Sequence, residues 1–569
     1  MRFLSRHVLH LFFSSLLISF PSFSQNLESI GKEDPFKING GISLNQILYK
    51  ANGIPNRRDP YSYFLTGNLS TSLYGWSIPL SFSVSNQNRA FQQPFNQFSL
   101  HPKYKWISAL AGYSSMTFSP YTLSGHIFRG AGAELTPGKF RFSAMYGRLQ
   151  KAVESDTIKK TLPAFQRNGF GIKTGYRDGN DYAEASLFHG KDEVSSLFTI
   201  PKDDSLLPEE NLVMGISLGK SFLEKFSLTG EFAQSAMTRD IRSEKDSTQS
   251  SFVNNSDLFT KRSSTSYYNA MKGGFNYSSN NHTIGLGYER IDPGYRTHGA
   301  YYFNNDLESY TVNGSTTLKD GKLNVSANAG VQHDNLDNSK VSTMKRFVGA
   351  LNIAYAPTNK LSLSGSYSNF QSFTNVRSQF VNINQLTPYD NLDTLKFTQI
   401  TQSINVSANY NLANDANRKQ FVFINISVQD AAEHQSQVTQ NSGSQFYNLN
   451  TSYALTFVPI NLTVNLSYNA NQNNGPAMDL ITHGPSLSLN KSLLERKLRL
   501  SLSSAFNNSI SEGKSINKII NARINAAYTL VKKHNLNLGV VTVNRNSSAA
   551  TGPKSFKEYT GTITYSYAF

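Results

Sequence analysis

The chain has 569 residues, of which 38% are hydrophobic and 16% charged, and it contains no cysteine. The missing cysteines exclude disulfide frameworks, thiolate zinc sites and cysteine nucleophiles. With 29 tyrosines and 38 phenylalanines the chain is too aromatic for a disordered protein, although its hydrophobic share lies below the roughly 45–50% of globular chains. After residue 24 no run of about 18 apolar residues occurs, which excludes a protein that crosses a membrane with several helices.

The N-terminus has the features of a secretory signal peptide. Arg2 and Arg6 give the charged start, an apolar stretch follows from Val8 to Phe20, and small residues precede the expected cleavage site. We therefore assign residues 1–24 to the signal peptide and residues 25–36 to a short periplasmic segment.

The chain is basic. Its formal net charge of +16 falls to +14 without the signal peptide, which contains two arginines and no acid. Such a surface suits anionic lipid head groups, those of lipopolysaccharide included, or an anionic permeant. Nucleic acid is disfavoured as a partner, because basic residues occur as scattered pairs such as Arg57 and Arg58 and not on a basic helix.

From about residue 37 to the end, apolar residues recur at every second position in stretches of about ten residues, which is the period of a β-strand. Clear examples run from Trp76 to Val84 and from Leu462 to Tyr468. The alternate positions carry mostly Ser, Thr and Asn, so each strand has one apolar face and one neutral, hydrogen-bonding face. The pattern predicts strands with hydrocarbon on one side and water on the other.

The breaks between these stretches alternate between short and long. Short ones, such as residues 319–322, have the composition of tight hairpin turns, whereas residues 190–210, 237–265, 291–306 and 370–398 form long polar breaks. This pattern is typical of a transmembrane antiparallel up-and-down β-barrel with short periplasmic turns and long extracellular loops. We predict an all-β protein whose residues 37–569 form a single barrel domain of about 26 strands. A soluble β-sandwich is disfavoured, because its connections would not alternate so regularly.

The last strand places Tyr565, Tyr567 and the C-terminal Phe569 on one face. Here the sequence resembles the Gram-negative outer-membrane β-barrel proteins, whose final strand commonly ends in an aromatic residue read by the barrel-assembly machinery. The resemblance implies integral insertion in the outer membrane and contact with that machinery during biogenesis, but no substrate. Only about a dozen residues lie between the predicted signal peptide and the first predicted strand, so we expect no N-terminal plug of the kind that the TonB-dependent transporters have.

A barrel of about 26 strands has a backbone diameter on the order of 50 Å, which is too wide to stay open in a permeability barrier. Inward-folded loops or a partner protein must therefore occlude the lumen. The best candidate is the Gly- and aromatic-rich loop from Phe118 to Gly132, in which Tyr121, His126 and Arg129 would line a constriction. An exposed loop packed on its neighbours is the alternative.

Charged residues of both signs fall on the predicted lumenal face, where they would either select solutes or pair with one another. A slip of one residue in register would turn each of them outward. These residues are Lys173, Glu184, Glu231, Lys272, Arg499 and Arg523.

The histidines are scattered singly, without an HExxH pair, and we expect no catalytic site, metal site or cofactor. The predicted function is that of a channel or transporter with a polar lumen occluded by loops or by a partner. The alternative is a non-conducting barrel subunit of a larger outer-membrane secretion, assembly or lipoprotein complex. The lack of a plug and of a periplasmic module favours this alternative, whereas the hydrophilic lumen favours transport.

Overall fold

The computed structural model describes residues 36–86, 97–155, 163–198, 206–246, 258–301, 304–340, 343, 345–369, 372–374, 398–432, 443–475, 479–548 and 555–569. The predicted signal peptide and residues 25–35 of the predicted periplasmic segment lie outside the described residues.

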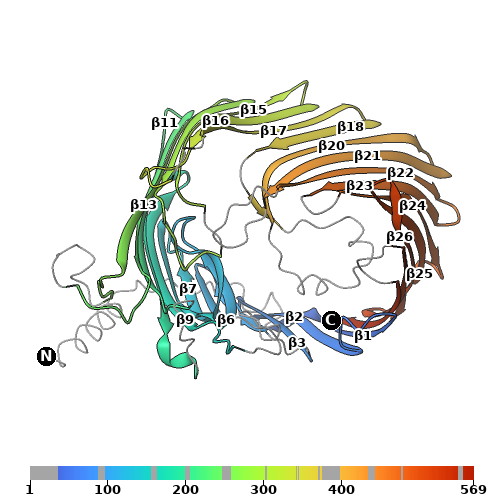
Figure 1. Ribbon diagram of the computed structural model, residues 1–569, viewed down its shortest axis with the longest axis horizontal. Coiled ribbons are helices and arrows are strands. Elements are labelled where there is room, and N and C mark those ends of the chain that lie inside the picture. Colours follow the sequence, from blue (N-terminus) through green and yellow to red (C-terminus); the bar gives the residue numbers. More distant parts are fainter. Residues whose placement is uncertain are drawn as a thin grey trace.

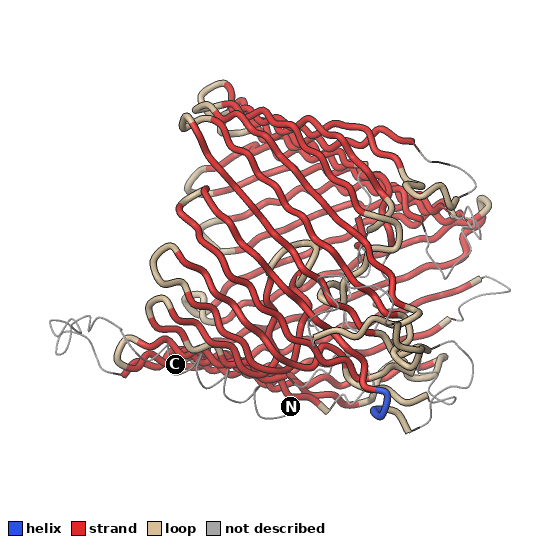
Figure 2. Tube along the Cα trace, turned by 90° about the vertical axis from the view of Figure 1, so that its left-hand side faces the viewer, coloured by secondary structure: helices blue, strands red, loops and turns tan. Residues whose placement is uncertain are grey.

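The described strands form one antiparallel sheet that closes on itself, because β1 pairs with β28 as well as with β2. Of the 28 strands, β4 and β5 share one position between β3 and β6, and β19 continues the position of β18 beside β20. The closed barrel therefore has 26 strand positions, which confirms the predicted all-β barrel. Figure 1 shows the strands following one another around the ring in chain order, and Figure 2 shows their tilt.

The strands have the following bounds: β1 (Phe36–Asn52), β2 (Tyr61–Leu73), β3 (Trp76–Ser85), β4 (Gln97–Leu100), β5 (Lys103–Tyr104), β6 (Ile107–Thr117), β7 (Ser124–Leu135), β8 (Phe140–Gln150), β9 (Gln166–Asp178), β10 (Asp181–Glu193), β11 (Glu210–Phe222), β12 (Phe226–Thr238), β13 (Thr265–Ser278), β14 (His282–Ile291), β15 (Leu307–Leu318), β16 (Leu323–His333), β17 (Lys345–Thr358), β18 (Leu361–Ser368), β19 (Ser372–Thr374), β20 (Thr398–Asn414), β21 (Arg418–Ala432), β22 (Gly443–Phe457), β23 (Leu462–Asn474), β24 (Asp479–Leu493), β25 (Leu498–Ser511), β26 (Lys514–Val531), β27 (His534–Ser547) and β28 (Phe556–Ala568).

The connections differ between the two ends of the barrel. At the end that holds the start of β1 and the end of β28, turns of two to four residues join the strands, as at Tyr74–Gly75 between β2 and β3. Both residues of that turn have positive φ (46° and 84°), and glycine adopts such a conformation without steric cost. Most connections at the opposite end are longer, but β25 and β26 are joined there by only Glu512 and Gly513.

The outer face of the barrel is apolar. On β14, Ile284 and Leu286 are each 58% exposed, and Val312, the cross-strand neighbour of Leu286 on β15, is 50% exposed. Aromatic rings gather on this face beside the short turns, where Phe222 and Phe226 stack with their centroids 5.5 Å apart. Since the closed sheet pairs its backbone groups between strands, this face is suited to hydrocarbon.

No helix among the described residues is long and apolar enough to cross a membrane. One 3-10 turn, η2 (Val194–Ser196), follows β10.

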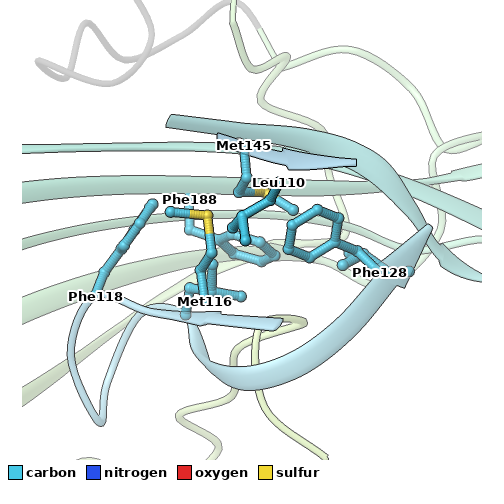
Figure 3. Close-up of a cluster of buried hydrophobic side chains, with 8 residues drawn as sticks. Leu110, Met116, Phe118, Phe128, Met145 and Phe188 are labelled. Atoms are coloured by element: carbon cyan, nitrogen blue, oxygen red, sulfur yellow. The ribbon is translucent and has the colours of Figure 1, made fainter. Parts of the chain in front are cut away.

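Among the described residues, the largest buried apolar cluster lies inside the ring, on β6, β7, β8, β10 and the turn after β6. This finding corrects the expectation of a neutral polar lumenal face for this part of the wall. Phe118 and Leu123 of the turn pack against wall residues such as Phe128 and Phe188, both fully buried (Figure 3). Gly171 on β9 leaves room for the Phe118 ring, since a Cβ at Gly171 would lie 2.7 Å from it. The apolar inner wall therefore serves as the base for a folded-in turn.

Candidate functional site

Two connections from the long-loop end fold into the barrel and bind each other. Residues 118–123 and residues 292–301 together form what we call the lumenal wedge. Tyr295 Oη donates to the carbonyl oxygen of Tyr121 (2.7 Å), and Thr297 Oγ1 donates to that of Thr122 (2.7 Å). Since Tyr121 is 2% exposed and Tyr295 fully buried, the contact excludes water.

Residues on the inner wall hold the wedge in place. Lys173 Nζ on β9 donates to the carbonyl oxygen of Phe118 (2.9 Å), and Ser235 Oγ on β12 donates to that of Arg296 (2.6 Å). Tyr121 Oη donates to a Glu289 carboxylate oxygen on β14 (2.5 Å). The wedge thus spans the inner face from β9 to β14.

A charged network fastens the second segment of the wedge. Arg167 on β9 binds Asp192 through two hydrogen bonds (2.7 and 2.8 Å) and Glu209 through a third (3.1 Å). Glu209 also accepts from Arg296 (3.2 Å) and from His298 Nε2 (3.1 Å), both in the wedge. Charge-assisted bonds of this kind are stronger than neutral ones.

Burial and charge oppose each other at this network. Burial alone would raise the pKa of Glu209, but the hydrogen bond from His298 and the charges of His298, Arg296 and Arg167 lower it to about 2. Burial lowers the pKa of His298, and the charge of Arg167 acts in the same direction. Above the ordinary pKa of histidine the network therefore joins an ionised Glu209 to a neutral His298.

The structure corrects the extent of the predicted constriction loop. β7 begins at Ser124, so only residues 118–123 lie in the connection, and Tyr121 alone of the three predicted residues belongs to it. His126 lies on the inner face of β7 and stacks on Tyr301, with centroids 4.1 Å apart. Arg129 is exposed on the face opposite Phe128, with its guanidinium 5.9 Å from the Tyr113 ring centroid, so it belongs to the outer wall.

The six predicted lumenal charges all lie on the face opposite the exposed apolar residues of their strands. Glu184 binds Lys173 (2.8 Å) and Arg177 (2.9 Å), which makes a paired cluster. Glu231 and Lys272 are cross-strand neighbours between β12 and β13. Arg499 and Arg523 lie on the other side of the barrel, on β25 and β26.

Three cross-strand rows on the inner face of β12 to β16 form a recess. The upper row holds Glu231, Lys272, Glu289, Ser309 and Gln332, neighbours in the pairing register. The middle row holds Thr229, Gly274, Gly287, Thr311 and Gly330, and the lower row includes Asn276, Gly285, Asn313 and Asn328. We call the upper row the charged shelf and the lower row the amide shelf. The middle row between them consists of small residues, so the wall is hollowed there.

This recess opens into a cavity of about 780 Å³, which we call the lumenal cavity. Tyr121 and Ala300 of the wedge border it on one side, and residues from each of the three rows border it on the other. Sequence reasoning identified Glu231, Lys272 and Tyr121 but missed Glu289 and the glycines. Gly285 and Gly287 occupy alternate positions of β14, and such a pattern in a sequence can indicate a recess in a sheet. Which residues of β13 and β15 lie beside them cannot be read from the sequence.

Residues 215–219 also escaped the sequence reasoning, since they read Gly-Ile-Ser-Leu-Gly and match the GxSxG spacing of a nucleophile elbow. They lie within strand β11 and not at the strand-to-helix turn that such an elbow requires.

The inner face of β20 to β26 carries a lattice of amides and hydroxyls, which we call the amide wall. Hydrogen bonds between uncharged side chains join neighbouring strands there. Other polar atoms of these side chains face the lumen. These bonds are Asn425 to Asn405 (3.3 Å), Asn448 to Ser427 (3.1 Å), Asn465 to Ser488 (3.1 Å) and Ser501 to Asn490 (2.7 Å).

The distribution of apolar and polar side chains over the two faces of the barrel wall indicates its location. Its closed antiparallel sheet exposes large apolar side chains outward and polar ones inward, and only hydrocarbon makes that arrangement favourable. Short turns lie at the end where β1 begins and β28 ends, and the last strand has the aromatic pattern of the family it resembles. The chain is an integral outer-membrane β-barrel.

No protein-family model and no curated protein matches this barrel. Solved structures of low similarity include the FrpB iron transporter from Neisseria meningitidis in its apoprotein form, with 12% identity and a TM-score of 0.37 over 93% of this chain and 81% of that one. The P pilus usher PapC translocation pore has 10% identity and a TM-score of 0.38 over 94% and 99% of the two chains. The copper transporter OprC has 8% identity and a TM-score of 0.39 over 93% and 80%. The evidence for the fold is the pairing of the barrel's own strands.

The C-terminal strand β28 closes the outer-membrane barrel. The backbone of Phe569 exchanges two hydrogen bonds with that of Gly40 on β1 (3.0 and 3.2 Å). On the outer face, Tyr565 Oη lies 2.7 Å from His534 Nδ1 on β27, and the Tyr567 ring packs on Phe569 at 5.5 Å. The residues of the predicted assembly signal therefore also form the seam.

Proposed function

We propose that the protein conducts polar solutes across the outer membrane through a passage between the lumenal wedge and the amide wall. The observation that carries this proposal is the asymmetry of the inner face. The strands from β6 to β14 support the folded-in wedge, whereas β20 to β26 present neutral amides and hydroxyls. A solute that sheds part of its hydration can exchange hydrogen bonds along such a wall.

The charges of the amide wall suggest a direction of selectivity. Arg499 and Arg523 lie on its inner face, and positive residues that line a passage favour anions over cations. We therefore expect the passage to admit neutral solutes in general and, among ions, to prefer anions weakly.

Conductance in a planar bilayer tests the proposal. The purified, heat-modifiable barrel should give steady single-channel currents, and Arg523→Gln should shift the reversal potential in a salt gradient toward cations. Lys518→Gln, on the outer face of the same strand, is the matched control and should leave the potential unchanged. Silence from a demonstrably folded barrel would contradict conduction.

A non-conducting subunit of a larger outer-membrane complex is the second candidate. The observation that favours it is the tight fastening of the wedge by Arg167, Glu209 and His298, because a permanently filled lumen needs such bonds. Co-purification of stable partner proteins after mild solubilisation, together with absent current, would support this candidate.

We also propose partners that follow from the location. Lipid and lipopolysaccharide would contact the apolar outer face and the exposed basic residues, and the barrel-assembly machinery would read Tyr565, Tyr567 and Phe569. Nucleic acid is not among the proposed partners. The function as proposed requires no cofactor, metal or catalytic step.

A further inference from the structure

The lumenal cavity has a shape built by small residues. A Cβ at Gly287 would lie 2.6 Å from Thr311 Oγ1, and one at Gly274 would lie 2.8 Å from Thr229 Oγ1. Larger residues in this row would fill the space between the charged shelf and the amide shelf. The cavity therefore exists because the middle row is small.

The charges around the cavity alternate in sign. Glu231, Lys272 and Glu289 are consecutive cross-strand neighbours, so the upper shelf reads negative, positive, negative. An anion placed there meets two carboxylates, and a cation meets the exposed Lys272. A charged ligand of either sign is therefore attracted by part of the charged shelf and repelled by the rest. A neutral ligand meets no such repulsion.

The hydrogen-bonding groups around the cavity are of mixed type. The carboxylates only accept, the Lys272 ammonium only donates, and the amides of Asn276, Asn313 and Gln332 do both. A ligand with many hydroxyl groups matches such a lining, because each hydroxyl both donates and accepts. An apolar ligand would leave these groups unpaired.

Two buried acceptors at the cavity, Glu231 Oε1 and Asn328 Oδ1, lack a partner among the described residues. Both oxygens are inaccessible to solvent. A buried acceptor without a partner costs about 1–3 kcal/mol, so a ligand hydroxyl would recover that cost once a shift of the side chain exposes the oxygen to the cavity.

From these observations we infer that the lumenal cavity binds a neutral polyhydroxylated solute, such as a small oligosaccharide. The inference rests on the proposed function, since it names the solute class that the passage would hold beside the wedge. Side chains of the three rows would contact the solute from the wall side, and Tyr121 and Ala300 would border it from the wedge side.

Isothermal titration of the folded barrel in detergent tests the inference, with maltotriose, cellotriose and N,N′,N″-triacetylchitotriose as neutral probes and citrate and spermidine as charged ones. At least one neutral probe should bind, and the charged probes should bind more weakly. Gly287→Leu should abolish this binding by filling the recess. Gly314→Leu is the matched control, because that glycine lies on β15 with its Cβ direction toward the outer face and a nearest contact of 3.4 Å.

Two milder variants keep the test decisive if Gly287→Leu fails to assemble. Glu289→Gln and Asn313→Ala should each weaken binding about five- to tenfold, since each removes one good hydrogen bond. Asn405→Ala, on the distant amide wall, should leave it unchanged. No binding by any neutral probe, tighter binding of a charged probe, or binding that survives Gly287→Leu would overturn the inference.

The outcome separates the inference from the proposed function. Currents without saccharide binding would contradict the solute class and leave conduction standing. Saccharide binding without current would contradict conduction and leave the binding site standing.

Discussion

Tyr295 Oη donates a 2.7 Å hydrogen bond to the carbonyl oxygen of Tyr121, 174 positions earlier in the chain. The two rings also meet edge to face, with centroids 6.3 Å apart. This contact joins the connection after β6 to the connection after β14, and neither segment alone would fill a wide lumen. The two tyrosines therefore couple the halves of the lumenal wedge.

Replacing Tyr295 by Phe should loosen the wedge. The carbonyl of Tyr121 would lose its donor in a buried site, which costs about 1–3 kcal/mol. Hydrogen exchange of residues 118–123 and 292–301 should accelerate, and single-channel conductance should rise. Tyr447→Phe, on the outer face, serves as the control. Unchanged exchange in the wedge would show that the Tyr295 hydroxyl does not hold it.

Acid should release the wedge. The pKa of His298 is lowered in the folded state, so its contribution is complete above the ordinary value of about 6.5 and declines as the pH falls below it. Glu209, whose pKa is lowered to about 2, adds a second loss as the pH falls from about 4.5 toward 2.

Hydrogen exchange of residues 292–301, corrected for the intrinsic pH dependence of exchange, measures this effect. Opening should increase from pH 7 to pH 5 in the natural protein. His298→Gln should remove that increase, because its side chain does not titrate. An equal increase in the variant would assign the acid effect to another group.

Phe188→Ala should destabilise the barrel more than a matched change on its outer face. Phe188 is fully buried in the apolar cluster beneath the wedge, and truncating a buried Phe costs about 3–5 kcal/mol. Phe232→Ala is the control, because Phe232 is 45% exposed on the outer face. The temperature at which the heat-modifiable band converts should fall further for Phe188→Ala. Equal shifts would show that the inner cluster adds no stability.

Removing the C-terminal aromatic side chain should impair assembly. Phe569→Ala keeps the backbone bonds to Gly40 but loses the ring that packs on Tyr567. We expect a sharply lower yield of folded barrel in the outer membrane, with Phe569→Tyr close to the natural yield. Full yield of Phe569→Ala would remove the proposed role of this residue as an assembly signal.

The sequence predicted the wall well, because alternation is a local property. The inward side of Glu231 and Arg523 follows from counting along a single strand. The wedge is not a local property: Tyr121 meets Tyr295 only because the eight strands from β7 to β14 separate and orient their two connections. The prediction that Arg129 lines the constriction was wrong, because the sequence did not show that β7 begins as early as Ser124. The glycine recess likewise depends on register across strands and not on any one strand.

Gly299 provides a test of the wedge that removes no polar group. A Cβ at this position would lie 2.4 Å from the carbonyl oxygen of Thr122, and because that atom is backbone, it cannot turn away. Gly299→Val should therefore separate the two wedge segments at a cost of about 1–3 kcal/mol, the range for overpacked sites.

Gly230→Val is the matched control for this change, since a Cβ at Gly230 meets nothing within 4 Å. The Gly299 variant should lose protection from hydrogen exchange at residues 118–123 as well as at its own segment, and it should conduct more than the control. Loss of protection confined to residues 292–301 would mean that the first segment is held by the wall alone, through Lys173 and Glu289. The wedge would then consist of two independent parts, and the Tyr295–Tyr121 bond would follow from their positions without maintaining them.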